Sequence, residues 1–423
     1  MREKKSVQEE NAMQTTLRAH AERILQASLA AVQPDAAVRR ALSAQSFPGP
    51  VTLIAAGKAA WPMAKAAYES PNVRIKRGIV LTKYGHAQGP LGPIACCEGG
   101  HPVPDENSFA NTERSLRLVE NLTAGDTVLF LLSGGGSALF EKPLLPVSQL
   151  QSITEQLLAC GADIVEINTI RKRLSAVKGG RFAQLCAPAQ VFSVVLSDIL
   201  GDPLDMIASG PAAPDSATCA DAQAIAEKYR LDLTPEAREL LRIETPKVLS
   251  NVTTQITGSV RELCAAASAA CRALGYEPVL LTDRLCCEAR EAGSFLSSIL
   301  RTHAGAGRSL AFLAGGETVV HLTGSGTGGR NQELALSAAI GLEGLEGAAV
   351  FSIGSDGTDG PTDAAGGYTD GSTAATLRSQ GINIYQALQN NDAYHALQAA
   401  GGLLITGPTG TNVNDIAVGL LQK

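Results

Sequence analysis

The stretch that decides the fold is LAGGETVVHLTGSGTGGRNQELAL (313–336), followed closely by FSIGSDGTDGPTD (351–363). In it, apolar strand-like runs end three times in a polar, glycine-rich turn. Glycines let backbone N–H groups approach a ligand closely, and the start of a following helix adds a partial positive charge. Arg330 supplies a guanidinium fork, and Asp356 supplies a carboxylate suited to a divalent metal. The stretch therefore contains the parts needed to bind and transfer a phosphoryl group.

The same succession of strand, glycine turn and helix continues through the rest of the chain. Apolar runs suited to strands cover 51–56, 78–83, 126–132, 191–197, 277–282, 309–315, 348–354 and 403–407. Several lack polar alternation, as expected for parallel strands covered by helices on both faces. We therefore predict an α/β fold with two doubly wound, mostly parallel α/β domains that face each other across a cleft. After the last of these runs we expect a final helix.

The polar, proline-containing stretch 213–247 is the predicted boundary between the two domains. It separates an N-terminal Rossmann-like domain, residues 14–240, from a C-terminal α/β domain, residues 241–423. Residues 1–13 are polar, and we expect them to form a flexible N-terminal extension.

The composition excludes several classes of protein. The chain has 423 residues, 45% of them hydrophobic, and a net charge of −6 without a long basic run. Disorder and binding to nucleic acid or to an anionic membrane are therefore not expected. No apolar run reaches the roughly 18 residues of a membrane span. The nine cysteines show no C-x-x-C spacing, so we expect reduced thiols in a cytoplasmic protein. The oligomeric state is not readable, and a homodimer is one option.

Polar residues follow the predicted strands of the first domain at their carboxyl ends, where open parallel sheets bind ligands. Lys58 follows one such strand after Gly57, Asp198 directly follows another, and Ser133-Gly134-Gly135-Gly136-Ser137 follows a third. Three consecutive glycines cost chain entropy, which favours a cradle for phosphate or carboxylate over a plain turn. Asp198 fits a metal ligand or general base, with a helix cap as the alternative. His101, in the rigid GGHPVPD loop, is a candidate substrate contact.

The second domain has a corresponding set of strand-end residues. With Arg330 and Asp356, we expect substrate or nucleotide binding by Glu317, Gly326, Gly328, Gly329, Asn331, Thr409 and Asn412. The glycines from Gly324 to Gly329 formally match the G-x-G-x-x-G fingerprint of dinucleotide-binding proteins. Against that reading, Arg330 and Asn331 stand where a cofactor-binding helix has small apolar residues.

Taken together, the motifs resemble one known family, the class II glycerate 2-kinases with a C-terminal MOFRL domain. The resemblance spans nearly the whole chain after residue 14, in family order. The segments that carry it are AAGKAA (55–60), GGHPVPD (99–105), LLSGGGSAL (131–139), INTIRKRLSAVKGGR (167–181), LSDILGDPLDMIASGP (196–211), LAGGETVVHLTGSGTGGRNQELAL (313–336), IGSDGTDGPTDAAGG (353–367) and TGPTGTNVNDI (406–416).

The resemblance implies ATP-dependent phosphorylation of D-glycerate at its 2-hydroxyl, which gives 2-phosphoglycerate and ADP, with Mg²⁺ as cofactor. It implies that residues 14–240 form the kinase domain and residues 241–423 the MOFRL-type domain. The family's catalytic Lys and Arg correspond to Lys58 and Arg330. From the chemistry of the residues, we expect Asp198 or Asp356 to hold Mg²⁺ or to accept the hydroxyl proton.

Two other functions compete with the kinase. Members of the family have also been labelled hydroxypyruvate reductases, so a NAD(P)-dependent hydroxypyruvate or tartronate-semialdehyde reductase is the main alternative. Reductase activity in the absence of ATP would distinguish this enzyme from a kinase. The third option is a protein that binds sugar acids or nucleotides without catalysis, and it would show no turnover.

Overall fold

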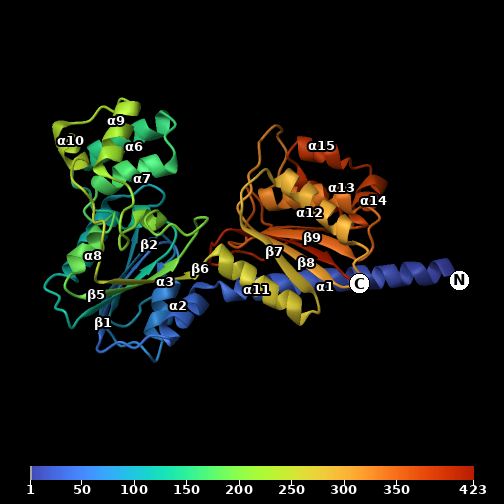
Figure 1. The fold of residues 1–423 in the computed structure, drawn as a ribbon, viewed down its shortest axis with the longest axis horizontal. Helices are drawn as coiled ribbons and strands as arrows, with labels where there is room; N and C mark the ends of the chain where they lie inside the picture. The colour runs from blue at the N-terminus through green and yellow to red at the C-terminus, as the bar shows by residue number, and fades with distance from the viewer. Residues whose placement is uncertain (1) are drawn as a thin grey trace. The chain divides into compact units, whose positions relative to one another are not determined.

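The computed structural model describes residues 2–423, with side chains described from Thr16 onward, and it divides into two compact units (Figure 1). We call residues 34–257 the parallel-sheet unit, and residues 1–33 with 258–423 the mixed-sheet unit. This division differs from the predicted domains, because residues 14–33 group with the C-terminal unit. Of the predicted flexible extension, Met1 lies outside the described residues, and the backbone from Arg2 onward belongs to helix α1.

The parallel-sheet unit is built on one six-stranded sheet with the order β3-β2-β1-β4-β5-β6. The registers of the first five strands are all parallel, and Ala56 at the end of β1 pairs with both Leu81 and Leu132. The carboxyl ends of β1, β2 and β4 are therefore level. The strands are β1 (Val51–Ala56), β2 (Ile75–Lys83), β3 (Ile94–Gly99), β4 (Thr127–Leu132), β5 (Gln190–Leu196) and β6 (Val252–Gly258).

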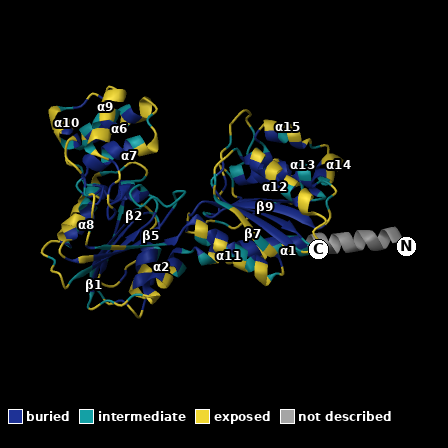
Figure 2. Cartoon of the chain, viewed as in Figure 1, coloured by how far each residue is buried: buried dark blue, intermediate teal, exposed yellow. Residues whose placement is uncertain are grey.

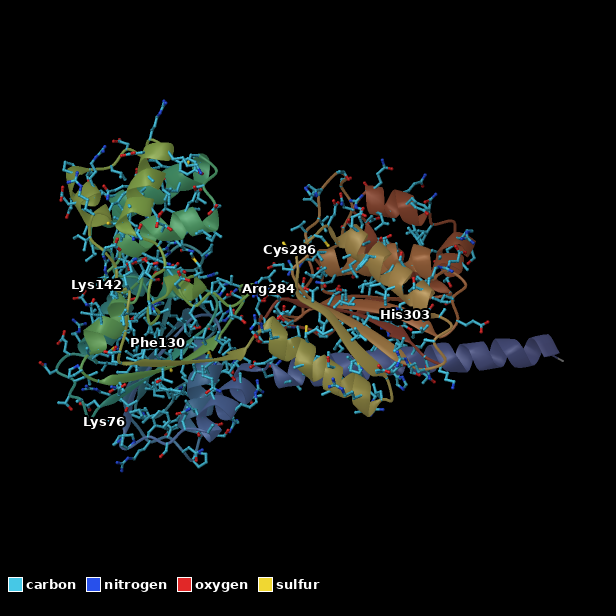
Figure 3. All side chains as sticks on the ribbon, viewed as in Figure 1. Lys76, Phe130, Lys142, Arg284, Cys286 and His303 are labelled. Carbon is cyan, nitrogen blue, oxygen red and sulfur yellow. The ribbon has the colours of Figure 1, made fainter. Side chains whose placement is uncertain are left out.

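Helices enclose this sheet, and its strands β1, β4 and β5 are almost wholly buried (Figure 2). The helices are α2 (Pro34–Ser43), α3 (Ala60–Tyr68), α4 (Glu106–Arg117), α5 (Gly136–Leu139), α6 (Val147–Ala159), α7 (Ile164–Arg173), α8 (Arg181–Cys186), α9 (Cys219–Lys228) and α10 (Pro235–Leu241), with a 3-10 turn at Ile207–Ser209. One face of the sheet packs on α2 and α3. On the other face, Phe130 of β4, labelled in Figure 3, packs its ring against Phe140 and Phe182. This aromatic cluster supports the loop that follows β4.

A separate hydrophobic core joins α6, α7, α9 and α10. It includes Leu157, Ile170, Leu174 and Ala237, all of them fully buried. The predicted domain boundary, 213–247, falls largely within this helical cluster. Its prolines and charges therefore mark the surface of a helical insertion rather than a linker.

The mixed-sheet unit contains a second six-stranded sheet with the order β11-β10-β9-β12-β8-β7. Only the β7–β8 pair is parallel, and the other four pairs are antiparallel. The strands are β7 (Glu277–Leu285), β8 (Leu310–Gly316), β9 (Ala348–Gly354), β10 (Gly366–Asp370), β11 (Leu403–Leu404) and β12 (Asp415–Leu421). The α/β class is as predicted, but the expectation of a mostly parallel second sheet is wrong.

Helices cover both faces of the mixed sheet. Helices α12 and α13 pack on one face, whereas α1 lies beside α11 on the other (Figure 1). The helices are α1 (Arg2–Ala31), α11 (Val260–Ala273), α12 (Ala289–His303), α13 (Arg330–Leu342), α14 (Thr373–Ser379), α15 (Ile384–Gln389) and α16 (Ala393–Ala399). The Arg18 guanidinium donates to the Gly401 and Leu403 carbonyls, which ties α1 to this unit.

The end of the chain is a strand rather than the predicted helix. β12 lies in the interior of the mixed sheet between β8 and β9, with all seven of its residues buried. An apolar run of this length fits either a buried strand or one side of a buried helix. Here two strand edges were available to pair with it, and the backbone hydrogen bonds decide the outcome.

Candidate functional site

The first candidate site lies at the carboxyl edge of the parallel sheet. Strand order reverses between β1 and β4, so their connections leave on opposite faces and open a crevice at their ends. Lys58 follows β1, the Ser133–Ser137 loop follows β4, and Asp198 follows β5. The prediction that these residues share one strand edge agrees with the geometry.

Backbone hydrogen bonds lock Lys58 to the glycine loop. The Lys58 N–H donates to the Gly134 carbonyl at 2.8 Å, and the Ala59 N–H donates to the Ser133 hydroxyl at 3.1 Å. A Cβ on Gly135, where φ is +85°, would lie 3.1 Å from Lys58 Cγ. The aliphatic part of the Lys58 side chain therefore lies against Gly135, which has no room for a side chain and has a left-handed backbone conformation.

His101 lies beside the same loop, as a Cβ on Gly135 would be 3.0 Å from its ring. Burial, and then the positive charges of Lys58, Lys83 and His86, lower the pKa of His101, which favours its neutral imidazole. His86 Nδ1 lies 3.1 Å from the Lys58 carbonyl. Several cationic or potentially cationic side chains therefore surround this strand end, which suits an anionic substrate.

Asp198 lies against the glycine loop, because a Cβ on Gly134 would overlap its carboxylate. Mg²⁺ in phosphoryl-transfer sites commonly takes one or two carboxylates, with phosphate oxygens and waters completing its shell. Asp198 therefore fits such an ion. The other predicted ligand, Asp356, belongs to the mixed-sheet unit. Within the described part of the chain, no cluster of three or more His, Cys, Asp or Glu side chains forms a metal site.

The second candidate site lies at one edge of the mixed sheet and centres on Arg330, the first residue of α13. Its Nε and Nη2 donate to both oxygens of Asp415 at 2.5 and 2.9 Å, and its Nη1 lies 3.3 Å from Glu317. The hydrogen bond to Asp415 raises the pKa of Arg330 and so secures its charge. The side chain is 34% exposed, so the fixed guanidinium still reaches solvent.

Asp359 occupies the start of α13. It accepts hydrogen bonds from the backbone N–H groups of Asn331 and Gln332, at 3.2 and 2.8 Å, and from the Asn331 amide at 3.3 Å. A Cβ on Gly329 would overlap the Asp359 carboxylate. The protein's own carboxylate therefore takes the place that a phosphate has at a dinucleotide-binding helix.

The glycine-rich segment 324–329 packs against another part of the same unit. A Cβ on Gly324 would lie 2.4 Å from Asn390 Cα, and the Gly326 N–H donates to the Asn390 carbonyl at 2.8 Å. Gly328 similarly approaches Ala393. The close approach that these glycines permit is to the chain itself, so the formal dinucleotide fingerprint has a packing role here. Nucleotide contact by Gly326, Gly328 and Gly329 stays a prediction.

The remaining predicted residues lie on adjoining loops at the Arg330 edge. The Thr409 hydroxyl donates to the Ser355 carbonyl at 2.6 Å, and its N–H donates to the Asp356 carbonyl at 3.1 Å. A Cβ on Gly354 would lie 3.3 Å from Asp356 Oδ1 and 3.5 Å from Asp415 Oδ1. Asn412 accepts the N–H of Asn414, whose amide reaches Glu317. These residues therefore form one connected polar edge.

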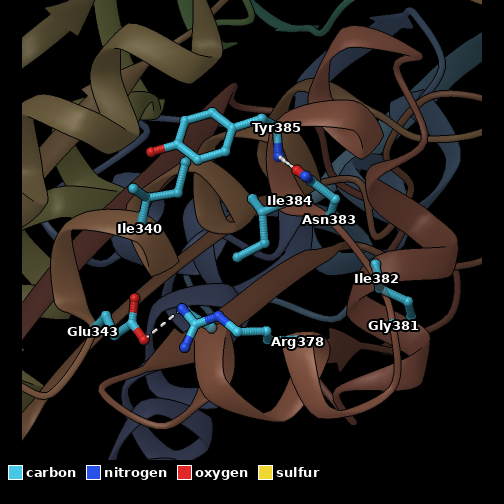
Figure 4. Close-up of a pocket in the computed structure, with 9 residues that line it drawn as sticks. Ile340, Glu343, Arg378, Gly381, Ile382, Asn383, Ile384 and Tyr385 are labelled. Carbon is cyan, nitrogen blue, oxygen red and sulfur yellow. Dashed lines mark hydrogen bonds and ion pairs between the residues drawn. The ribbon is translucent and has the colours of Figure 1, made fainter.

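The described residues of the mixed-sheet unit also line cavities. One, of about 420 Å³, lies among Ile340, Arg378, Ile384 and Tyr385, with an ion pair between Arg378 and Glu343 (Figure 4). None of the predicted site residues lines it. Another, of about 550 Å³, lies between α1 and residues 404–409 and includes the predicted Thr409.

Comparison with known proteins identifies the family. Residues 20–242 match the domain of unknown function DUF4147, and residues 310–415 match the MOFRL family. The D-glycerate 2-kinase of Thermotoga maritima is 54% identical, over 94% of this chain and 97% of that protein. The chain belongs to the glycerate 2-kinase family.

Other members of the glycerate 2-kinase family agree with this assignment. The glycerate 2-kinase of Pyrococcus horikoshii is 41% identical over 89% of this chain and 88% of its own. A crystal structure of the Thermotoga maritima glycerate kinase matches with a TM-score of 0.92 at 52% identity, covering 96% of this chain and all of that one. A relative from Agrobacterium vitis, 39% identical over 93% of this chain and 92% of its own, carries a provisional name as a hydroxypyruvate reductase. The predicted family and the predicted α/β class are therefore confirmed.

The structure adds residues that sequence reasoning did not select. Asp415 and Asp359 hold Arg330 and the start of α13, and Lys83 and His86 stand near His101. Lys83 is the last residue of the predicted strand 78–83 and His86 lies three residues beyond it, so the strand-end rule would have found them. Asp415 gave no such signal, because it precedes a strand that we expected to be a helix.

Proposed function

We propose that the chain transfers the γ-phosphoryl group of ATP to the 2-hydroxyl of D-glycerate, giving 2-phosphoglycerate and ADP. The observation that carries the proposal is the convergence of Lys58, the Ser133–Ser137 loop and Asp198 at the switch point of the parallel sheet. These residues offer a positive charge, a small-residue cradle and a carboxylate, which are the parts that phosphoryl transfer requires. The 54% identity to a protein named D-glycerate 2-kinase supports the choice of substrate.

The chain's own residues would act by positioning and by charge. As the substrate oxygen bonds to the γ-phosphorus, the bond from that phosphorus to the ADP oxygen breaks, and negative charge spreads over the phosphoryl oxygens. Lys58 would stabilise that charge, and the glycine loop would hold phosphate or carboxylate oxygens. The His101 imidazole would form a hydrogen bond with the substrate. Acceptance of the hydroxyl proton is the alternative role of the Asp198 carboxylate, if it does not bind the metal ion.

Magnesium fits the donor set at this edge. Asp198 would hold the ion through its carboxylate oxygens, with phosphate oxygens and waters as the other ligands. When bound, Mg²⁺ would neutralise part of the negative charge of the phosphate groups. A role for Asp356 as a second ligand stays a prediction.

In the mixed-sheet unit, we assign Arg330 the second cationic role that the family resemblance implies. Its bidentate bond to Asp415 fixes the guanidinium plane, which is the preorganisation that charge stabilisation requires. The described residues include no helix long and apolar enough to cross a membrane. A cytoplasmic location and a homodimeric assembly stay predictions from the sequence.

The test is ³¹P NMR of the purified protein with ATP, Mg²⁺ and D-glycerate. We expect a new phosphomonoester resonance with the shift of 2-phosphoglycerate, growing together with the resonances of ADP. Authentic 2- and 3-phosphoglycerate added to the same sample would fix the regiochemistry. L-Glycerate in place of D-glycerate is the stereochemical control.

An unchanged ATP spectrum would contradict the proposal. Oxidation of NADH or NADPH by hydroxypyruvate in the same preparation would then favour the reductase. If neither kinase nor reductase turnover is detected but calorimetry still shows binding of D-glycerate, the result would favour a binding protein without catalysis.

A further inference from the structure

Two fully buried charges lie directly beneath the Ser133–Ser137 loop. Lys178 and Glu141 are both 0% exposed, and they form an ion pair. Lys178 Nζ also donates to the Ser137 carbonyl at 2.6 Å. Removing two charges from water is expensive, so a buried pair is weak evidence for stability and suggests a role in specifying structure. The structure that this pair specifies is the second half of the glycine loop.

The Ser137 side chain is held from a second direction. Its hydroxyl lies 3.0 Å from the hydroxyl of Ser209, which donates in turn to Asn168 Oδ1 at 3.0 Å. Ser209 is completely buried, and Asn168 is 4% exposed. The carbonyl and the hydroxyl of Ser137 therefore have separate buried partners, from different parts of the chain.

The turn that carries Ser209 has an unusual backbone. Ala208, Ser209 and Gly210 are consecutive residues with φ of 49°, 62° and 64°. Residues other than glycine rarely adopt this left-handed conformation, and such strain tends to occur at functional sites. Ala208 also restricts the loop sterically, because a Cβ added to Gly136 would lie 2.7 Å from the Cβ of Ala208.

The two supports are joined to each other by the backbone. The Gly179 N–H donates to the Ser209 carbonyl at 3.0 Å, and the Gly180 N–H donates to the Gly210 carbonyl at 2.7 Å. Lys178, directly before these glycines, is thus fixed relative to the strained turn. The Lys178–Gly180 and Ala208–Gly210 segments form one platform under the loop.

We propose that Lys178 with Glu141, and Ser209 with Asn168, are positioning residues that fix the glycine loop in the conformation that receives a phosphate or carboxylate group. The proposal rests on the proposed kinase function and deepens it. None of the four residues need touch the substrates. Each acts through Ser137 or through the platform that holds it.

The test combines kinase assays with hydrogen exchange on four variants of the full chain. Ser209→Ala removes the hydroxyl, and Ser209→Gly removes it while also relieving the left-handed strain. The double variant Lys178→Met with Glu141→Gln removes the contact to Ser137 together with both charges of the buried pair, and it also takes away the carboxylate that lies 3.9 Å from Arg171. Arg173→Met is the matched control, because Arg173 is also fully buried and ion-paired but has its hydrogen bonds to the Thr169 and Ala217 carbonyls.

We expect the Ser209 and Lys178–Glu141 variants to lower kcat/KM on the order of 10-fold. A misplacement of about 1 Å can cost ~100-fold, and we expect the loop to shift by less than that. Amide exchange in the peptide spanning residues 129–140 should become faster in the same variants. Ser209→Gly should show this loss although its melting temperature is at least that of Ser209→Ala. Arg173→Met should leave exchange in this peptide unchanged.

Hydrogen exchange keeps the two proposals separate. If the wild-type chain shows no kinase activity, the proposed function fails, and faster exchange in 129–140 still supports the positioning role. Folded variants with wild-type exchange in that peptide and wild-type kcat/KM would overturn it. Equal acceleration in Arg173→Met would also overturn it, because general loosening of the unit would then explain the effect.

Discussion

Lys58 is the residue on which the proposed chemistry depends most directly. Its side chain is partly buried, and its backbone is locked to Gly134 at the switch point of the sheet. Lys58→Ala should lower kcat by about 100-fold or more, because a preorganised donor to the transition-state charge is lost. The melting temperature should change little, since the backbone contacts remain. Steady-state kinetics with ATP and D-glycerate, together with thermal unfolding, measure both quantities.

Lys65 offers a matched control on the following helix. It is exposed and forms an ion pair with Glu69 at 2.7 Å, a surface contact of small energetic value. Lys65→Ala should keep wild-type turnover. A Lys58→Ala enzyme that also turns over normally would reject the assigned role.

At the residue scale, the sequence predicted which strand-end residues meet but not what holds them. Lys58, Asp198 and the glycine loop were found because the carboxyl-end rule needs only the order of strand and turn. Asp415 and Lys178 were not selected, because their roles depend on partners 85 and 41 residues away. No local pattern reveals contacts at such separations.

Helix α4 begins with a cap that also shapes the loop containing His101. Asp105 accepts the Ser108 N–H at 2.9 Å and the Tyr84 hydroxyl at 2.6 Å. Burial opposes ionisation, but these hydrogen bonds outweigh it and lower the pKa of Asp105 to about 2. Asp105→Ala should therefore reduce the free energy of unfolding at pH 7 by about 1 kcal/mol.

The pH dependence of that loss has a definite sign. The native pKa lies below the usual value of about 3.9, so the stabilisation is complete above pH ~4 and disappears as pH falls toward 2. Urea unfolding at several pH values should show the gap between wild type and Asp105→Ala closing in this window. Asp105→Asn keeps one acceptor oxygen for the cap but carries no charge, so its stability should not show this dependence on pH. A gap that is independent of pH would contradict the assignment.

Helices α12 and α13 approach so closely that glycine is required at their contact. A Cβ on Gly293 of α12 would overlap the Leu334 carbonyl of α13. Gly293→Ala should destabilise the protein by about 1–3 kcal/mol, as overpacking does. Because α13 begins at Arg330, kcat should also fall. Thermal unfolding by circular dichroism and kinase assays measure the two effects.

Gly305→Ala is the control for this substitution. Nothing lies within 4 Å of a Cβ at Gly305, so the free energy of unfolding should stay within about 0.5 kcal/mol of wild type. Equal stability of the two variants would show that the helices separate without cost.

At the element scale, the sequence predicted strands better than their directions. The run 348–354 coincides with β9, and 51–56 with β1, because buried apolar runs between glycines leave few alternatives. The second sheet was expected to be parallel because its strands lack polar alternation. However, antiparallel strands that are covered on both faces show the same continuous pattern. The final helix expected after Asn412 was wrong for another reason, because a short apolar run fits a buried strand as well as one side of a buried helix.

At the scale of the whole molecule, the N-terminal helix belongs to the unit formed by the C-terminal half. The Thr411 hydroxyl donates to the Val32 carbonyl at 2.9 Å, and His20 contacts Tyr276. The sequence could not show this grouping, because an amphipathic helix does not reveal which sheet it will cover. The predicted domain of residues 14–240 therefore differs from the unit that the contacts define.

A single substitution in α1 tests that grouping, and the only tryptophan of the chain provides the readout. Trp61 lies in the parallel-sheet unit, so its fluorescence follows that unit alone, whereas far-ultraviolet circular dichroism follows both. Ile24 of α1 is 0% exposed, so Ile24→Ala should cost about 2–5 kcal/mol in the mixed-sheet unit. We expect the circular dichroism transition to move to lower temperature while the Trp61 transition stays in place. Val38→Ala, at an equally buried site in α2, is the reciprocal control and should lower the Trp61 transition. A Trp61 transition that moves with Ile24→Ala would mean that α1 stabilises the parallel-sheet unit as well, against the division proposed here.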